Sequence, residues 1–454
     1  MTDVKENKMG VMPVGKLLVN MSTPMMLSML TQALYNIVDS IFVAMISEDA
    51  LTAVSLAFPL QTLMIAFGIG TGVGVNALVS RYLGAKKFEK ANEIATTGVR
   101  LSLITYVVFA IFIFFSCEPF FRLQTSNEAI VDAGVTYMKI VGILSIGMFF
   151  QAMMEKLLQA TGKTSLSMTT QIVGAVINMI MDPILIFGYF GFPKMGIAGA
   201  ATATIFGQIV AGSLALYFNK TKNKEIHISL KTYPLTLKTV KKIYAIGFPS
   251  IIMQAIGSVM TFGFNKILIV FSSTATAVFG VYFKLQSFVL MPIFGLNNGM
   301  MPIVAYNFGA RKPERIVKTL KLSYAAAVII MIIGIVIFWT IPDKLLLLFS
   351  ASDDMLSIGI PALRIISLHF LLAGFSIVSS SCFQALGHGF ISMINSIIRQ
   401  LLVLLPAAYI LSRIGGLSVV WWSFPIAELV AVAMAVFFMI RVYKNEIKPL
   451  FVKE

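Results

Sequence analysis

Charged residues and cysteines are scarce in this chain of 454 residues. Asp, Glu, Lys and Arg make up 12% of it, against roughly 25% in soluble domains, which argues against a soluble protein. Two cysteines rule out a disulfide framework and argue against a metal–thiolate centre. The motifs HExxH and GxSxG are missing, and Leu157 stands where a phosphate loop ending in Gly162-Lys163-Thr164 needs glycine. We therefore expect neither an enzyme nor a bound cofactor.

Apolar residues make up 58% of the chain, enough for roughly 12 bilayer spans of about 20 residues each. The apolar runs predict an all-α polytopic membrane protein with twelve spans in two six-helix bundles. We predict an N-lobe at 1–218, a basic linker at 219–242, and a C-lobe with a short tail at 243–454. The spans lie near 16–46, 52–81, 92–116, 129–157, 165–190, 195–218, 243–270, 277–306, 317–341, 355–384, 390–412 and 417–440.

The net charge of +15 is concentrated in alternate gaps between these spans. Lys and Arg cluster at 81–90, 219–242 and 311–321, whereas the gaps 118–132 and 343–354 are mixed or acidic. Basic gaps are typical of the cytoplasmic side, so we predict that both termini are cytoplasmic. Because topology accounts for the charge, we expect the lipid bilayer rather than nucleic acid as a partner.

An internal repeat links the two halves at a constant offset of 225 residues, as in Pro24 and Pro249. Two repeats with an even number of spans enter the membrane from the same side, which makes them parallel. Such symmetry is typical of transporters that expose a central cavity alternately to each side, although duplicated channels also exist. Further pairs are Leu60-Gln61 and Leu285-Gln286, Gly70 and Gly295, Gly74 and Gly299, 84–87 and 309–312, and 159–162 and 384–387.

Two aspartates lie far from the ends of their spans, where a charge is costly and therefore suggests function. Asp39 shares a helix face with Tyr35 and Asn36, four and three residues earlier. Asp182 shares a face with Asn178, one turn before it. Positions 264 and 407, which are 225 residues further on, hold Phe and Ala, so the carboxylates are confined to the first half. This asymmetry favours a coupling site over a structural polar cluster.

Desolvation and mutual repulsion favour a proton shared by such a pair of carboxyl groups. If an organic cation and a proton or sodium ion cannot occupy the pair together, their binding is linked and exchange follows. The sequence thus predicts an antiporter.

The second half offers Glu428, near the centre of the last span, as a secondary cavity residue, and pairing with Arg399 as its structural alternative. Glu155, near the cytoplasmic end of the fourth span, fits a topology or gate contact better than a substrate ligand. Three cations, Lys284, Arg364 and Arg399, leave open a flippase for lipid-linked saccharides, and a passive channel is the third alternative.

Several segments together resemble the multidrug and toxic compound extrusion (MATE) transporters, over nearly the whole chain. Because it has two aspartates in the N-lobe, the chain resembles the DinF branch of that family and its MepA-like bacterial drug pumps. The segments are Pro24, Tyr35–Asp39, Arg81–Lys86, Leu158–Gly162, Asn178–Pro183 and Gly199–Thr204.

The resemblance implies a monomeric pump in the bacterial inner membrane that exports organic cations, including antibiotics and dyes, in exchange for protons or sodium. It implies a cation site at Asp39, Asp182, Asn178 and Thr204, with Thr202 as an alternative. Sodium, if used, would bind at the first three, and Pro24 would act as a hinge. We place the substrate cavity at Tyr35, Asn36, Gln208 and Glu428.

Overall fold

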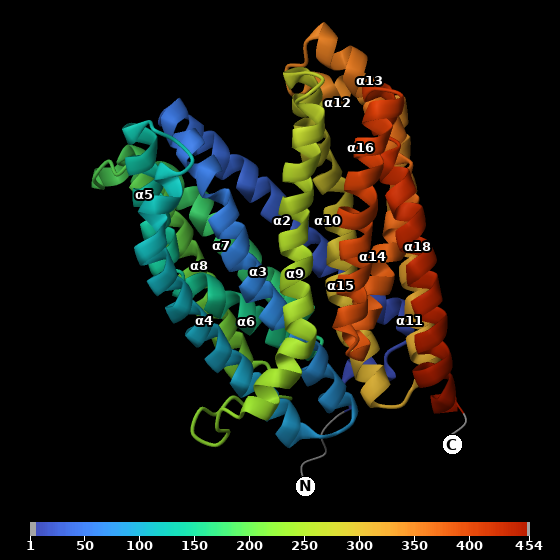
Figure 1. Ribbon diagram of the computed structural model, residues 1–454. Helices are drawn as coiled ribbons and strands as arrows, with labels where there is room; N and C mark the ends of the chain where they lie inside the picture. The colour runs from blue at the N-terminus through green and yellow to red at the C-terminus, as the bar shows by residue number, and fades with distance from the viewer. Residues whose placement is uncertain (1–5, 452–454) are drawn as a thin grey trace. The chain divides into compact units, whose positions relative to one another are not determined.

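The computed structural model describes residues 6–451, and this part of the chain forms helices and turns without strands (Figure 1). It divides into two compact units. The N unit comprises Leu27–Ile251, and the C unit comprises the described residues up to Met26 together with those from Ile252 onward. The outer ends of the predicted lobes, 1–5 and 452–454, lie outside the described residues.

Two long helices, α2 (Val14–Ala44) and α9 (Leu237–Leu268), each contribute to both units. The N unit also holds α3 (Glu48–Gly84), α4 (Phe88–Arg122), α5 (Glu128–Ile143), α6 (Ile146–Ala160), α7 (Thr164–Phe187), η1 (Tyr189–Gly191) and α8 (Ile197–Thr221). The C unit holds α1 (Lys8–Val11), α10 (Ser273–Gly309), α11 (Pro313–Thr340), α12 (Pro342–Leu347), α13 (Asp353–Ser367), α14 (His369–Leu386), α15 (Gly389–Ile397), η2 (Ile398–Leu404), α16 (Leu405–Ile414), α17 (Leu417–Val420), α18 (Ser423–Val442), η3 (Tyr443–Ile447) and η4 (Lys448–Phe451).

The predicted twelve spans are confirmed. Within residues 6–451, eleven helices are long and apolar enough to cross a membrane, and α5 with α6 forms a twelfth span bent by 45°. Exposed Ile, Val, Leu and Phe side chains line the outer faces of these helices, as a lipid environment requires.

The repeat is visible in local geometry as well as in sequence. Ser47 and Ser272, 225 residues apart, both cap a helix by accepting a backbone N–H at 3.0 Å. Lys86 and Arg311, at the same offset, both adopt a left-handed φ, of 55° and 56°. Lys86 and Arg311 lie in turns between two spans, so the two halves use the same turn chemistry.

The unit boundaries also keep the repeat offset. The N unit begins after Met26 and ends at Ile251, which is 225 residues further on, and a proline lies two residues before each boundary, at 24 and 249. The predicted lobes 1–218 and 243–454 stay a prediction, but the compact units differ from them: the first half of each crossing helix packs with the opposite half of the sequence.

Glycines that recur in the repeat allow these crossing helices to pack closely against α3 and α10; we call these close contacts the glycine seats. In the N unit, a Cβ on Gly74 of α3 would lie 2.3 Å from the carbonyl oxygen of Ile243 in α9. In the C unit, a Cβ on Gly299 of α10 would lie 2.4 Å from the Ser22 Oγ in α2. Only glycine allows the two backbones to approach this closely, which explains the spacing of small residues in both halves.

Two spans expected to be continuous are broken. The span predicted at 129–157 breaks at Leu144–Ser145, and the one at 355–384 breaks at Leu368. At the first break the Ser145 hydroxyl donates to the carbonyl of Gly142 at 2.7 Å, and at the second the Ser367 hydroxyl donates to the carbonyl of Arg364 at 3.0 Å. Hydropathy does not register such breaks, because the residues on both sides of each break are apolar enough for one span.

The segment between α8 and α9 packs along the start of α4. Tyr233 donates to Glu89 at 2.6 Å, and this hydrogen bond raises the pKa of Tyr233. The backbone N–H of His227 donates to Asn92 at 2.7 Å, and Arg100 donates to the carbonyls of Leu230 and Tyr233. The predicted basic linker is therefore bound to one helix face of the N unit.

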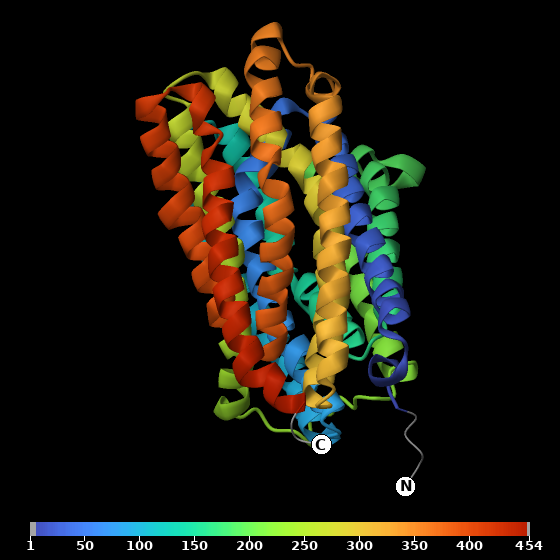
Figure 2. The same ribbon diagram turned by 90° about the vertical axis from the view of Figure 1, so that its right-hand side faces the viewer.

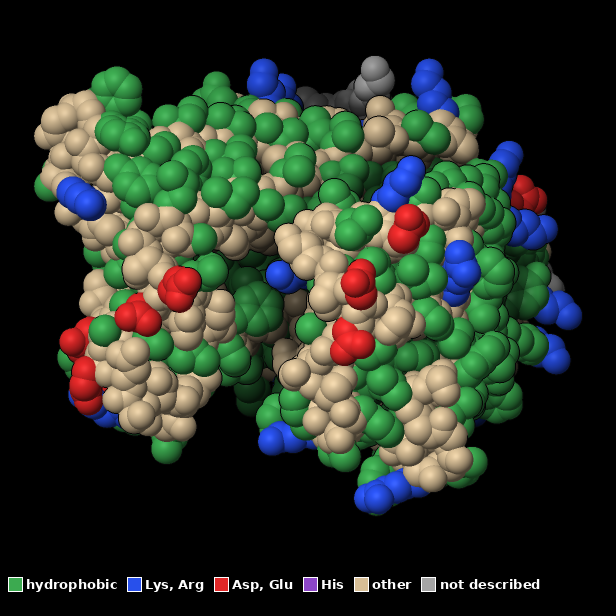
Figure 3. Space-filling model, turned by 90° about the horizontal axis from the view of Figure 1, so that it is seen from above, with side chains coloured by type: hydrophobic (Ala, Val, Ile, Leu, Met, Phe, Trp, Pro, Cys, Tyr) green, Lys and Arg blue, Asp and Glu red, His purple; other side chains and the backbone are tan. Residues whose placement is uncertain are grey.

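In the C unit, α1 and η4 lie at the same end (Figure 2). Asn307, near the end of α10, donates to the carbonyl of Met9 at 3.0 Å, and η4 contacts α11. On the opposite face, toward which α12 and α13 point, acidic side chains are interspersed with Lys and Arg (Figures 1 and 3). The ends of the C unit thus differ in charge, as the alternating gaps predict.

The glycine seats predict a specific sensitivity. Replacing Gly74 or Gly299 by Ala forces two backbones apart, and overpacking of this kind costs about 1–3 kcal/mol, so the melting temperature in detergent should fall. Gly280→Ala is the control, because no atom lies within 4 Å of its Cβ position. Equal melting temperatures for all three variants would contradict the close packing.

Candidate ion-coupling site in the N unit

Three helices of the N unit meet in a small apolar cluster that fixes the site. Val43 of α2, Ile186 of α7 and Ala200 of α8 are all fully buried in it. Each lies four residues from a polar side chain: Asp39, Asp182 and Thr204, respectively. Since residues four apart share a helix face, the cluster brings these three polar groups together one turn away.

The two aspartates face each other. Their carboxyl groups lie close enough to interact, and a hydrogen bond between them would need a proton on one of the two. Asp182 is fully buried and Asp39 half-buried. When both are ionised, Asp39 Oδ1 and both Asp182 oxygens are buried acceptors without a donor. Buried charged oxygens without a donor are costly, and a proton or a cation between them would lower that cost.

A second polar layer lies one turn from the aspartates. Asn178 donates to the Thr204 hydroxyl at 3.2 Å, and Tyr35 interacts with the same threonine. Asn178 and Tyr35 stand four residues before Asp182 and Asp39, so the two layers have the same helix register. Close packing of α7 and α8 permits the bond, because a Cβ on Gly207 would lie 2.7 Å from the Gly174 carbonyl oxygen.

Of the two threonine alternatives, Thr204 joins this group. Thr202 donates to the Ala198 carbonyl of its own helix at 2.7 Å. Asn36 is exposed, whereas Gln208 has a buried Oε1 without a donor. These placements are geometric, and the roles of all predicted site residues stay predictions.

Two further polar residues near the aspartates, Tyr137 of α5 and Gln61 of α3, were not predicted from the sequence. Tyr137 is buried, accepts a hydrogen bond from Gln61 at 3.1 Å, and interacts electrostatically with both aspartates. Gln61 belongs to a pair that recurs in the repeat, which was a usable signal. Tyr137 is a single tyrosine in an apolar span, and it gave no signal in the sequence.

Glu155 lies in a separate buried network. Its carboxylate accepts hydrogen bonds from Gln151 at 2.9 Å, Thr170 at 3.1 Å and Gln171 at 2.7 Å. Ser28 of α2 donates to Gln171 in turn. A carboxylate surrounded by neutral donors of the protein fits the expected contact role better than a role as substrate ligand.

Glu428 and Pro24 lie in the C unit. Glu428 is 3% exposed and accepts from Arg399 at 3.0 Å, so the structural alternative for this residue holds geometrically, although its Oε1 has no donor. Pro24 lies inside α2, two residues before the helix joins the N unit.

The donor set for a metal ion is limited to oxygen. Nowhere in the described chain do three or more His, Cys, Asp or Glu side chains come together. Asn178 adds a buried, unpartnered amide oxygen beside the aspartate pair. An all-oxygen group of this kind suits a hard cation such as sodium, or a proton.

Comparison with known proteins identifies the family. The MatE family model matches residues 24–184 and 249–410, which keeps the repeat offset and covers more than half of the chain. The chain belongs to the MatE family. Membership places it among membrane transporters rather than enzymes.

Relatives and solved structures of this family cover almost the full length. The multidrug export protein MepA of Staphylococcus haemolyticus is 27% identical over 93% of both chains. A protein named FAD transporter from Shewanella oneidensis is 26% identical over 92% of both chains. The outward-facing structure of a multidrug resistance MATE transporter of the MOP superfamily superposes with a TM-score of 0.92, at 25% identity and 100% coverage of both chains.

The Asn178–Thr204 bond makes a testable distinction between the two threonines. We expect Thr204→Val to lower transport, because it removes the acceptor that holds Asn178 beside the aspartates; such interhelical bonds are worth about 0.6 kcal/mol on average in membranes. Thr202→Val is the matched control and should leave dye efflux from proteoliposomes unchanged. If the Thr202 variant alone loses efflux, the geometric choice is wrong.

Proposed function

We propose that this MatE transporter is a multidrug efflux antiporter that exports organic cations in exchange for protons or sodium. The observation that supports it most is the Asp39–Asp182 pair, whose buried oxygens lack any protein donor when ionised. One bound positive charge, either the coupling ion or the substrate, satisfies them. Competition for the pair then links the inward movement of one to the outward movement of the other.

The sign of the site favours a cationic substrate. Its charged groups are both carboxylates, and Asn178, Thr204, Tyr35 and Tyr137 are neutral. An anionic substrate such as FAD, carried according to its name by the Shewanella relative, would need cations at this place. The same reasoning disfavours a flippase, since Arg399 is paired with Glu428, while Lys284 lies 5.8 Å from the Phe349 ring centroid.

Alternating access requires α2 to move with respect to its site partners. Pro24 removes one helical hydrogen bond beside the position where α2 passes between units, which supports the hinge assignment. We place the protein as a monomer in the bacterial cytoplasmic membrane with its basic end inside. Export of a monovalent cation against 100 mV costs about 2.3 kcal/mol, which exchange for one proton cancels.

We expect Asp39→Asn and Asp182→Asn each to abolish dye efflux from proteoliposomes. The single carboxyl group left in each variant can no longer exchange a proton or sodium ion for the substrate. Proton and sodium gradients, imposed separately, identify the coupling ion. Asp132→Asn, at an exposed position of α5, is the matched control and should transport normally.

Retained, gradient-driven efflux in both aspartate variants would refute the assignment of the site. Dye flux through the wild-type protein without any imposed gradient, at the same rate, would instead indicate a passive channel.

A further inference from the structure

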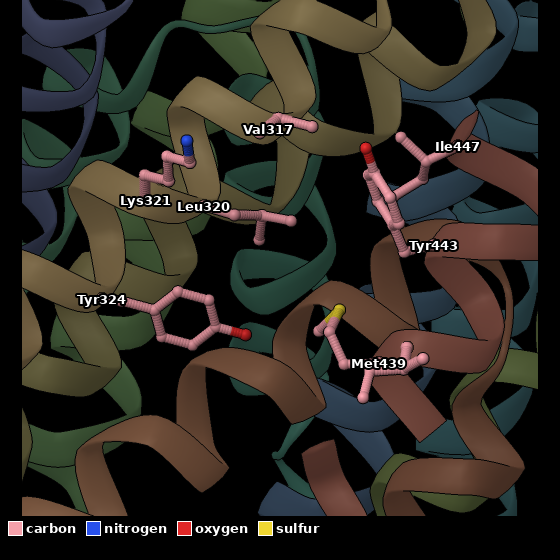
Figure 4. Close-up of a pocket in the computed structure, with 8 residues that line it drawn as sticks. Val317, Leu320, Lys321, Tyr324, Met439, Tyr443 and Ile447 are labelled. Carbon is pink, nitrogen blue, oxygen red and sulfur yellow. The ribbon is translucent and has the colours of Figure 1, made fainter. Parts of the chain in front are cut away.

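A groove opens between two helices of the C unit at its basic end (Figure 4). α11 and α18 both pack against α14 but hardly touch one another, which leaves α14 as the floor between them. The groove has a volume of about 260 Å³. Its lining residues are Val317, Leu320, Lys321 and Tyr324 of α11, and Met439, Ile440, Tyr443 and Ile447 of α18 and η3.

The surface of the groove is apolar, and its lining residues include one charged side chain, Lys321, whose amine does not contribute to that surface. Val317, Leu320, Lys321 and Tyr324 have helical spacing, so they form one face of α11. The Tyr324 hydroxyl is hydrogen-bonded to Ser379 of the floor at 2.8 Å, and its ring stacks on Phe375 at 4.7 Å. Lys321 is exposed, so its amine is free to meet a charged group beside the apolar groove.

The position of Lys321 matches the level of lipid headgroups. In α11 the basic stretch ends at Lys321, and the apolar run continues from Leu322. In α18 the apolar run ends at Ile440, and basic residues begin at Arg441. The groove therefore spans the boundary between the hydrocarbon and the basic end of the C unit.

The local charge selects an anion. Glu446 on η3 pairs with His388, which removes one of the two nearby carboxylates from competition. Segments 313–324 and 439–451 carry six cations and two carboxylates: Arg315, Lys318, Lys321, Arg441, Lys444 and Lys448 against Glu314 and Glu446. A second site for organic cations would be repelled by this surface.

We propose that this groove binds an anionic phospholipid. Its phosphate lies at Lys321, and the part of an acyl chain next to the headgroup lies between α11 and α18. Basic pockets between transmembrane helices bind such headgroups, and each cation near an anionic membrane surface contributes about 1 kcal/mol. Apolar contact with Leu320, Met439 and Ile440 retains the chain. The site is independent of the aspartate pair in the N unit.

The experiment is native mass spectrometry of the full-length protein in detergent, titrated with phosphatidylglycerol or with phosphatidylcholine of the same acyl chains. We expect Lys321→Gln to weaken phosphatidylglycerol binding about fivefold, the factor that corresponds to about 1 kcal/mol. Lys344→Gln is the matched control, because Lys344 is an exposed lysine of the C unit that lies on α12, outside the two segments that supply the charge around the groove. It should bind like the wild type.

A second variant, Ile440→Trp, fills the groove from an exposed position and should lower the binding of phosphatidylglycerol without removing a charge. Glycerol phosphate, which has the headgroup but no chain, should fail to compete. Equal binding of both lipids by the wild type, or unchanged binding by both groove variants, would overturn the proposal and leave Lys321 as a lysine that only extends toward water.

Discussion

The contact of two carboxyl groups inside an apolar bundle is the constraint on which the N unit depends. Ionising both Asp39 and Asp182 with no cation bound between them costs free energy, because their buried oxygens lack protein donors. The surrounding helices hold this contact by packing rather than by charge: Val43 and Ile186, one turn further along, are fully buried against each other's helices. A site that is incomplete without a cation follows from this arrangement.

α2 contributes to both units and carries one of the two aspartates. It leaves the C unit after Met26, is hydrogen-bonded through Ser28 to Gln171 beside Glu155, and carries Asp39 toward α7. Loss of a proton at the pair would thus change the fit of a helix that both units share. The repeat supplies the same crossing in α9, but with Phe264 at the position that corresponds to Asp39, which confines the chemistry to one unit.

Much of this could be predicted from the sequence, because its determinants are local or periodic. Hydropathy defined the spans, the constant offset identified the repeat, and helical spacing linked Asp39 to Tyr35 and Asp182 to Asn178. Three features escaped it. Tyr137 interacts with the aspartates from a helix without any polar pattern. The span breaks leave the apolar composition of each span unchanged. The assignment of each crossing helix to a unit depends on packing that only coordinates reveal.

Proton release upon substrate binding tests the central claim most directly. Purified protein in weakly buffered detergent, titrated with a permanently charged organic cation in the absence of sodium, should release protons at a pH where the aspartate pair holds one. Asp39→Asn should release none. Binding of the cation with no change in bound protons at any pH, and with equal affinity in the variant, would contradict competition for the aspartate pair.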